Sequence, residues 1–123
     1  MFKQCGTLRI TRFEVPATAI TGQSIQFMCL YELGEDNLYS LKWYKNETEF
    51  FRFEPNGEKL VQVFPIPEIT LDLKRSNNGT LLVATDISND STGNYKCEIS
   101  ADTSFLTVYR EQMMIVLGTC CSS

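Results

Sequence analysis

The sequence contains no histidine among its 123 residues. Histidine is the side chain most often used as a general base near neutral pH, so no serine–histidine or cysteine–histidine nucleophile can form within this chain. The carboxylates are scattered over loop-like segments such as YELGED, and no pair has a spacing that would fix it across a cleft. We therefore predict that the chain is not an enzyme and takes no cofactor or small-molecule substrate.

Long runs of a single residue type are also absent. Acidic and basic residues are interspersed at a net charge of -4, which excludes the electrostatic signature of a nucleic-acid binder.

No stretch near the start is apolar enough for a secretory leader, and the run MMIVLG is too short to cross a bilayer. We expect one domain of a longer secreted or surface-attached precursor, with any membrane anchor in other parts of it. A cytosolic protein is the alternative.

Short alternating segments and turns make up most of the sequence. Residues 24–31 alternate strictly, which places Ile25, Phe27 and Cys29 on one face of a half-buried strand. Further strands are expected at 38–45, 49–53, 69–74, 80–87 and 94–100, separated by turn clusters. Pro16 indicates an edge strand or a kink between two half-strands. The pattern predicts one all-β domain at 8–117, a two-sheet antiparallel sandwich, with an extension at 1–7 and a tail at 118–123.

Two cysteines and a tryptophan form the most informative pattern. Cys29, Trp43 and Cys97 follow one another in the order found in immunoglobulin domains, where a disulfide between the sheets packs against the tryptophan. Tyr95, two residues before the second cysteine, occupies the place of the tyrosine corner between strands E and F. We predict a Cys29–Cys97 disulfide with Trp43 and Tyr95 in the core. Two reduced thiols near a core tryptophan are the alternative.

The long interval between these cysteines leaves room for the C′ and C″ strands of a variable-type domain, and residues 49–53 are the natural C′ strand. Variable-type domains usually carry an aspartate shortly before the second cysteine, where this sequence has Ser91, preceded by Asp90. The candidate arginine of strand D, Arg75, therefore lacks its usual partner.

Three N-glycosylation sequons begin at Asn46, Asn78 and Asn89. They are expected in the C–C′ turn, the D–E turn and the E–F connection, where a glycan would project into solvent. Asparagine is also a common turn residue, so each site alone fits a turn without a glycan. We predict a glycan on at least one of the three when the protein is secreted from animal cells.

Three further cysteines, Cys5, Cys120 and Cys121, do not belong to the sandwich pattern. Adjacent cysteines rarely bridge each other, and these three lack the CxxC spacing of zinc sites. We expect no metal site. The three cysteines are assigned to a truncated end or to a link with other chains or domains.

Alternation also predicts which side chains face away from the core. In the predicted strand at 38–45, Leu41 and Trp43 point inward. In the predicted strand at 94–100, the inward residues are Tyr95, Cys97 and Ile99. The outward positions of these strands are Ser40, Lys42, Tyr44, Lys96, Glu98 and Ser100.

The strand at 49–53 offers two faces, and burial of Arg52 would cost several kcal/mol without a partner. We therefore expect Phe50 and Arg52 outside, with Phe51 and Phe53 inside. Together with Phe105 in a later loop, the outward aromatics and arginine predict a protein-binding surface. Simple packing of Phe50 on the Tyr44 ring is the alternative.

Three segments carry a family resemblance: VPATAITGQSIQFMCLYEL, LYSLKWYKNETEFFRFEP and YKCEISADTSFLTV. Over residues 8–117 the chain resembles the first immunoglobulin domain of the beaten-path family of arthropod neuronal surface proteins. Leu38 to Lys45 and Glu49 to Phe53 match the family's strand C and C′ motifs with aromatic substitutions only. Cys97 to Phe105 matches its Cys-Glu-Val-Ser-Ala-Glu-x-Pro-Ser-Phe segment, with Asp102 for the glutamate and without the proline.

The resemblance implies an extracellular protein, secreted or at the cell surface, usually with a second immunoglobulin domain. It also implies heterophilic binding to Sidestep-type immunoglobulin receptors in axon guidance and synaptic partner choice. A generic structural or immune-type immunoglobulin domain that mediates protein contacts is the alternative. A structural immunoglobulin domain of an intracellular muscle-type protein is a further alternative, and it would not favour a disulfide. Intact mass before and after reduction therefore separates an extracellular domain from an intracellular one.

Overall fold

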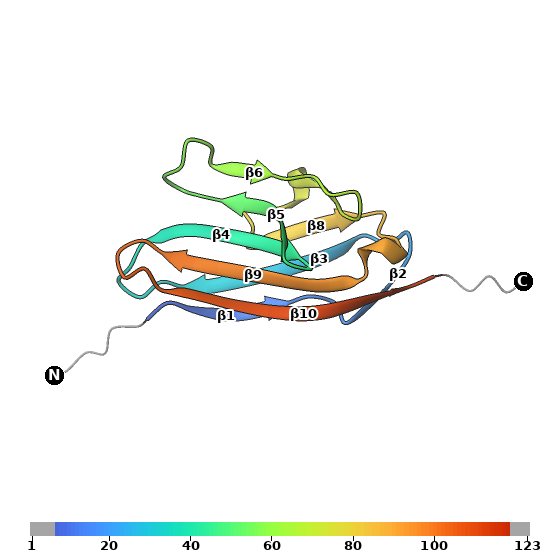
Figure 1. The fold of residues 1–123 in the computed structure, drawn as a ribbon, viewed down its shortest axis with the longest axis horizontal. Helices are drawn as coiled ribbons and strands as arrows, with labels where there is room; N and C mark the ends of the chain where they lie inside the picture. The colour runs from blue at the N-terminus through green and yellow to red at the C-terminus, as the bar shows by residue number, and fades with distance from the viewer. Residues whose placement is uncertain (1–6, 119–123) are drawn as a thin grey trace, which may run out of the picture.

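The alternating segments form two packed β-sheets in the computed structural model, which describes residues 7–118 (Figure 1). One sheet has the strand order β1-β3-β8-β7, and the other has the order β2-β10-β9-β4-β5-β6. The elements are β1 (Arg9–Glu14), β2 (Thr18–Ile20), β3 (Ile25–Glu32), β4 (Leu38–Lys45), β5 (Thr48–Phe53), β6 (Val61–Val63), β7 (Thr70–Leu71), η1 (Leu73–Arg75), β8 (Leu81–Thr85), η2 (Asn89–Ser91), β9 (Gly93–Ala101) and β10 (Thr107–Leu117). The predicted all-β sandwich is confirmed, and β5 and β6 occupy the C′ and C″ positions of a variable-type domain.

Pro16 lies where the chain passes from one sheet to the other. The segment before it, β1, pairs antiparallel with β3, whereas β2 pairs parallel with β10. Because proline cannot donate a ladder hydrogen bond, it interrupts pairing and allows the two half-strands to separate. The kink expected at this residue is therefore present, and among the named strands of residues 7–118 only β2 and β10 pair parallel.

The disulfide and the tryptophan lie in the centre of the core. Cys29 of β3 is bonded to Cys97 of β9, with their Cα atoms 6.5 Å apart, and both are fully buried. Trp43 is the cross-strand neighbour of Cys97, and its ring stacks on Phe27 at 5.4 Å between centroids. Its indole Nε1 donates a 2.8 Å hydrogen bond to the carbonyl of Gly79. The predicted bridge and its tryptophan are confirmed.

The position of Gly79, whose carbonyl accepts the tryptophan N–H, requires glycine because of its backbone conformation and its close packing. It has a φ of +89°, and a Cβ there would lie 2.5 Å from Leu41 Cδ2 and 2.8 Å from Phe51 Cε1. A side chain would therefore be strained by the backbone and would collide with the core. The Asn78–Gly79 turn thus brings a backbone acceptor to the buried indole, which satisfies its N–H group.

The tyrosine corner is also present. The hydroxyl of Tyr95 donates to the backbone carbonyl of Ser91, and the Ser91 hydroxyl donates at 2.7 Å to the carbonyl of Glu68. Ser91 is fully buried and completes a capping box with Ser88 at the start of η2. Arg75 instead pairs with Asp72, Nε to Oδ2 at 2.8 Å. Ser91, at the position of the usual aspartate, therefore bonds a backbone carbonyl and not an arginine.

The strand expected at 69–74 is shorter than predicted. Only Thr70 and Leu71 pair with β8, and the chain then turns into η1. Asp72 caps this turn by accepting the backbone N–H of Lys74, and its carboxylate also holds Arg75. An aspartate that bonds its own following backbone competes with the sheet ladder, so the strand ends there.

The prediction that Phe50 faces outward is wrong, because β5 contains a bulge. Trp43 pairs with Phe51, but its neighbour Tyr44 pairs with Glu49, so Phe50 is an extra residue without a partner on β4. A bulge breaks the strict alternation of a strand. Phe50 and Phe51 are consequently both buried, each about 1% exposed, and Glu49 takes the outward side with Arg52.

Candidate protein-recognition face

The outward face of the six-stranded sheet carries most of the residues that the sequence assigned to partner binding. On β4 and β9, Lys42 lies opposite Glu98 and Tyr44 lies opposite Lys96, and all four are partly exposed. Ser100 is also partly exposed, and its hydroxyl lies 3.0 Å from that of Thr107 on β10. The β4 and β9 positions of the predicted face are therefore brought together.

Tyr44 and Lys96 form the centre of this face. The hydroxyl of Tyr44 donates a 3.0 Å hydrogen bond to Glu98 Oε1. Burial and this carboxylate raise the pKa of the Tyr44 phenol well above its ordinary value. Lys96 Nζ lies over the Tyr44 ring at 4.8 Å from its centroid and is 3.0 Å from Glu47 Oε1. The centre is thus a fixed network that presents one aromatic ring, one ammonium and two carboxylates.

Arg52 lies at the β5 side of the face and is already engaged within the domain. Its Nε and Nη2 atoms donate to the two carboxylate oxygens of Glu49 at 2.7 and 2.9 Å. Its guanidinium carbon also lies 5.4 Å from the centroid of the Phe64 ring. This bidentate hydrogen bond raises the pKa of the Arg52 guanidinium. A partner would therefore contact a neutralised pair here and not a free positive charge.

Phe105 is the most exposed aromatic side chain that the structure describes, at 85%. It has a φ of 60°, a conformation that is uncommon for a bulky residue. The backbone around it is nevertheless tied, because Ala101 N–H donates to the Leu106 carbonyl at 2.8 Å across the loop. The β9–β10 loop thus holds a phenyl ring in solvent.

Asp36, in the loop between β3 and β4, forms hydrogen bonds with the β9–β10 loop that carries Phe105. Its carboxylate accepts the backbone N–H groups of Thr103 and Ser104 at 2.8 and 3.0 Å. The Asp102 N–H donates at 2.8 Å to the carbonyl of Asn37. Hydrogen bonds from Ser104 and Thr103 hold the pKa of Asp36 well below its ordinary value. Two loops distant in sequence therefore form one unit under Phe105.

Two exposed tyrosines extend the face and were missed by sequence reasoning. Tyr109 on β10 is 56% exposed, and Lys96 Nζ lies 5.3 Å from its ring centroid. Alternation would have found Tyr109 if β10 had been assigned as a strand. Tyr39 is 55% exposed because a register irregularity between Leu38 and Ser40 leaves it without a partner on β9. The same irregularity accompanies burial of Ser40, which was expected outside.

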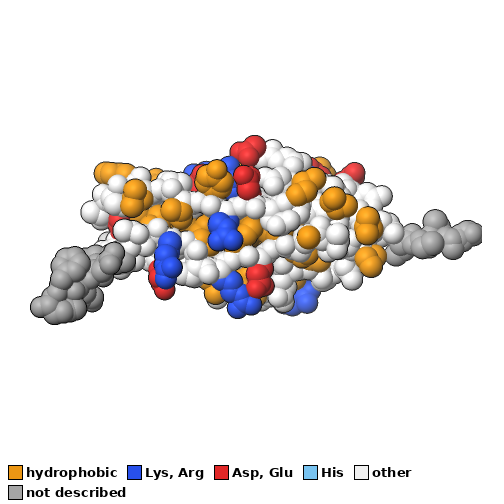
Figure 2. All heavy atoms as spheres, turned by 90° about the horizontal axis from the view of Figure 1, so that it is seen from below, with side chains coloured by type: hydrophobic (Ala, Val, Ile, Leu, Met, Phe, Trp, Pro, Cys, Tyr) orange, Lys and Arg blue, Asp and Glu red, His pale blue; other side chains and the backbone are white. Residues whose placement is uncertain are grey.

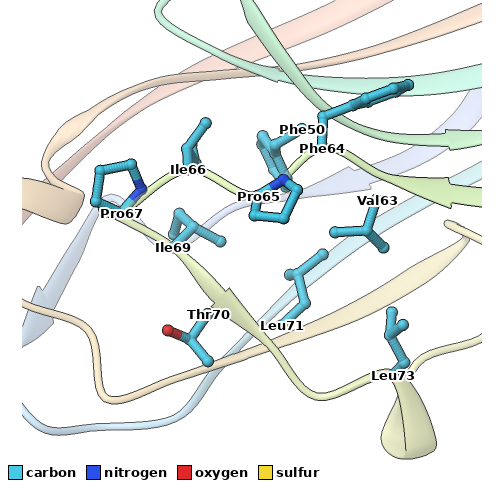
Figure 3. A pocket seen from close by; sticks show the side chains of 10 residues that line it. All are labelled: Phe50, Val63, Phe64, Pro65, Ile66, Pro67, Ile69, Thr70, Leu71 and Leu73. Carbon is cyan, nitrogen blue, oxygen red and sulfur yellow. The ribbon is translucent and has the colours of Figure 1, made fainter.

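A separate apolar hollow of about 320 Å³ lies beside the edge strands β6 and β7. Figure 3 shows Phe50, Pro65, Ile69 and Leu71 directed toward this space. Its complete lining is Phe50, Val63, Phe64, Pro65, Ile66, Pro67, Ile69, Thr70, Leu71 and Leu73. The lining includes no titratable side chain, so it offers no general acid or base.

Hydrophobic side chains also gather where β10 ends. Figure 2 shows several orange side chains toward the right-hand end of the molecule. The exposed apolar residues of β2 and of the C-terminal part of β10 are Ile20, Met113, Ile115 and Leu117. This second patch lies on the same outward side of the sheet as Tyr109, by the alternation of β10.

The other residues that the sequence analysis singled out lie on turns or outside the described residues. Asn46 lies between β4 and β5, Asn78 precedes β8 and Asn89 begins η2, and all three are exposed. Cys5, Cys120 and Cys121 lie outside the described residues. Within residues 7–118 there is no cluster of three potential metal-ligating side chains. None of the helices described there is long and apolar enough to span a membrane.

Comparison with known structures shows that the fold is immunoglobulin-like. The chain is similar to extracellular domains 3–5 of Drosophila OTK, with 18% identity and a TM-score of 0.64 over 91% of this chain and 35% of that one. It is similar to titin M4, with 17% identity and a TM-score of 0.57 over 94% of this chain and 100% of that one. It is also similar to a chain of a titin M10–obscurin-like 1 complex, with 16% identity and a TM-score of 0.61 over 93% of this chain and 97% of that one.

No family model and no curated protein sequence matches this chain. Identities this low establish the fold alone, so the chain is an immunoglobulin-like domain, and the beaten-path resemblance stays a prediction. The chain spans about a third (35%) of the OTK fragment that it matches.

Proposed function

We propose that this domain is an extracellular recognition module that binds a second immunoglobulin-type domain through the outward face of β4, β9 and β10 and the loop that carries Phe105. The observation that supports this most strongly is the exposure of Phe105 at 85% on a loop tied by Asp36. A large aromatic held in solvent costs free energy in the isolated domain and contributes contact area in a complex. Preorganisation lowers the entropy lost on binding.

The composition of the face favours a protein partner. Tyr39, Tyr109 and Phe105 are exposed aromatics, and aromatic residues dominate the energetic centres of protein interfaces. Beside Tyr109 lies the Tyr44–Lys96–Glu98 network, whose mixed charges suit a partner with complementary polar groups. Such a surface gives specificity without a strong net charge.

The partner class that we propose is a Sidestep-type receptor, bound heterophilically in axon guidance and synaptic partner choice. This step rests on the beaten-path resemblance of Leu38 to Phe53 and Cys97 to Phe105. The Cys29–Cys97 disulfide supports an oxidising compartment, as for a secreted or cell-surface protein. Docking of sheet faces would leave the β1-β3-β8-β7 sheet turned away from the partner.

Surface-plasmon measurements with a panel of Sidestep-type ectodomains test this proposal. We expect Phe105→Ala and Tyr109→Ala each to weaken binding by about 2 kcal/mol or more, because both truncate exposed aromatic anchors. Leu30→Ala, an exposed hydrophobic truncation on the opposite sheet, is the matched control and should change binding by less than about 0.5 kcal/mol.

The two parts of the proposal fail in different ways. If the wild-type domain binds no member of the panel, the Sidestep assignment is wrong. If it binds but only Leu30→Ala reduces affinity, the face is wrong. Thermal melts of each variant establish that the comparison is made between folded proteins.

A further inference from the structure

We propose that the hollow between Tyr39 and Phe105 receives an arginine side chain of the partner, with Asp102 as its counter-ion. The inference rests on the proposed function in that a protein partner supplies the arginine, and it specifies the chemistry of the contact. The hollow has a volume of about 430 Å³ and is lined by Tyr39, Ser100, Ala101, Asp102, Phe105 and Thr107. It is therefore spacious enough for a side chain to enter from outside.

The lining combines the two features that recognise a guanidinium group. Tyr39 and Phe105 contribute two aromatic rings, and a planar guanidinium stacks on such rings with cation–π attraction. Asp102 contributes a carboxylate, which arginine can contact with two parallel hydrogen bonds. Ser100 and Thr107 add hydroxyl groups that can accept further N–H donors. A lysine ammonium would use the charge but not the planar stacking.

Asp102 is available for such a contact. Among residues 7–118, no salt bridge includes Asp102, whereas the nearby Glu54 lies 4.0 Å from Arg52 Nη1. The residue is exposed, and its backbone is fixed because its N–H donates to the Asn37 carbonyl. The backbone of Asp102 is thus held at the hollow, and no salt bridge within residues 7–118 neutralises its carboxylate.

The charge of the surrounding loops also favours a cation. A second hollow, of about 220 Å³, lies on Tyr39 as well and is lined by Glu54, Asn56, Gly57 and Asp102. The three loops at this end, residues 33–37, 54–60 and 102–106, contain five acidic residues and one basic residue, Lys59. Their summed field attracts a positively charged group toward Tyr39. This charge complementarity distinguishes arginine from a neutral or acidic occupant.

The loop that carries Phe105 is fixed by hydrogen bonds before any partner binds. The backbone of this loop is tied to Asp36 through Thr103 and Ser104, and the ring is 85% exposed. The hollow is consequently open before a partner arrives. A guanidinium placed against Phe105 would gain an aromatic contact without the cost of ordering the loop.

An NMR titration of the whole chain with N-acetyl-arginine amide tests the site without any partner protein. We expect saturating shifts of the backbone amides of Ser100, Asp102 and Thr107. N-acetyl-citrulline amide, a neutral molecule of nearly the same shape, should bind at least about fivefold more weakly, because it lacks the charge. Asp102→Asn should reduce the affinity for the arginine probe to a similar extent.

Asp90→Asn is the matched control, since Asp90 is an exposed acid on η2 and does not line the hollow. It should leave the affinity for the arginine probe unchanged. Equal binding of the arginine and citrulline probes, or equal loss in the two variants, would overturn the inference. Shifts confined to other surfaces would overturn it as well.

The outcome is separable from that of the proposed function. If the arginine probe binds at Asp102 but no Sidestep-type ectodomain binds the chain, the site stands and the partner class is wrong. If an ectodomain binds and Asp102→Asn leaves its affinity unchanged while Phe105→Ala weakens it, the face stands and the arginine contact is wrong.

Discussion

Phe50 packs edge-on against Tyr95, with the ring centroids 6.3 Å apart and the planes at 81°. This contact joins β5 to the tyrosine corner, since the same Tyr95 bonds the Ser91 carbonyl through its hydroxyl. Edge-to-face aromatic pairs contribute about 0.5–1.5 kcal/mol beyond the area they bury. The bulge in β5 therefore adds a core aromatic and removes one from the recognition face.

Replacement of Phe50 is expected to affect stability. Phe50→Ala would leave a cavity beside Tyr95, and we expect a loss of about 3–5 kcal/mol in the free energy of unfolding, measured by denaturant titration. Phe105→Ala removes the same atoms from an exposed site and should change stability by less than about 0.5 kcal/mol. Equal effects of the two substitutions would contradict the assignment of Phe50 to the core.

Removal of the disulfide is expected to destabilise the domain strongly. The bridge between Cys29 and Cys97 closes a segment with a sequence separation of 68 residues. In the chain-entropy model a loop of this size contributes about 4 kcal/mol. Unfolding of the Cys29→Ala/Cys97→Ala variant should therefore occur at clearly lower denaturant concentration. Intact mass should rise on reduction of the unfolded wild-type chain, and no rise from this pair would contradict the bridge.

The loop that carries Phe105 should depend on the charge of Asp36. Its carboxylate accepts two backbone N–H groups of this loop, besides that of Asn37, and Asp36→Asn keeps only one comparable acceptor oxygen. We expect hydrogen exchange at Thr103 and Ser104 to become at least about fivefold faster. Glu35→Gln alters the neighbouring acid and should leave these rates unchanged, and an equal increase in both variants would argue against a specific tie.

The same contact predicts how the loop responds to acid. Because the pKa of Asp36 is lowered in the folded domain, its stabilisation is complete above the ordinary aspartate pKa of about 4 and is lost as the pH falls toward the lower, folded value. Protection at Thr103, after correction for intrinsic exchange, should therefore be constant between about pH 7 and pH 5. Loss of protection near neutral pH would show that another group controls the loop.

Glycan attachment can be tested on a secreted precursor. Asn46, Asn78 and Asn89 are all exposed on turns, so we expect at least one to carry a glycan in animal cells. Treatment with a peptide glycosidase should lower the mass, and single Asn→Gln variants should identify the site. An unchanged mass would leave the sequons as ordinary turn residues. A glycan at Asn46 would also change the edge of the face beside Glu47.

The sequence alone determined the sandwich, the disulfide and the core, because these follow from residue types at positions that local geometry preserves. Alternation along 24–31 and 94–100 placed Cys29, Tyr95 and Cys97 inside, and Pro16 marked the break between the half-strands. A strand without irregularities turns every second side chain to the same face, so parity along the chain was sufficient there.

Only the tertiary structure decided which aromatics face a partner. Phe50 turned inward and Tyr39 outward because each is the unpaired residue of a register irregularity. Such irregularities depend on how two distant strands pair, and a single residue more on one strand reverses the parity that the sequence suggests. The hydrogen bonds between Asp36 and the Phe105 loop likewise join segments far apart in the chain. This contact exists only once the sheet has brought both loops to the same end of the domain.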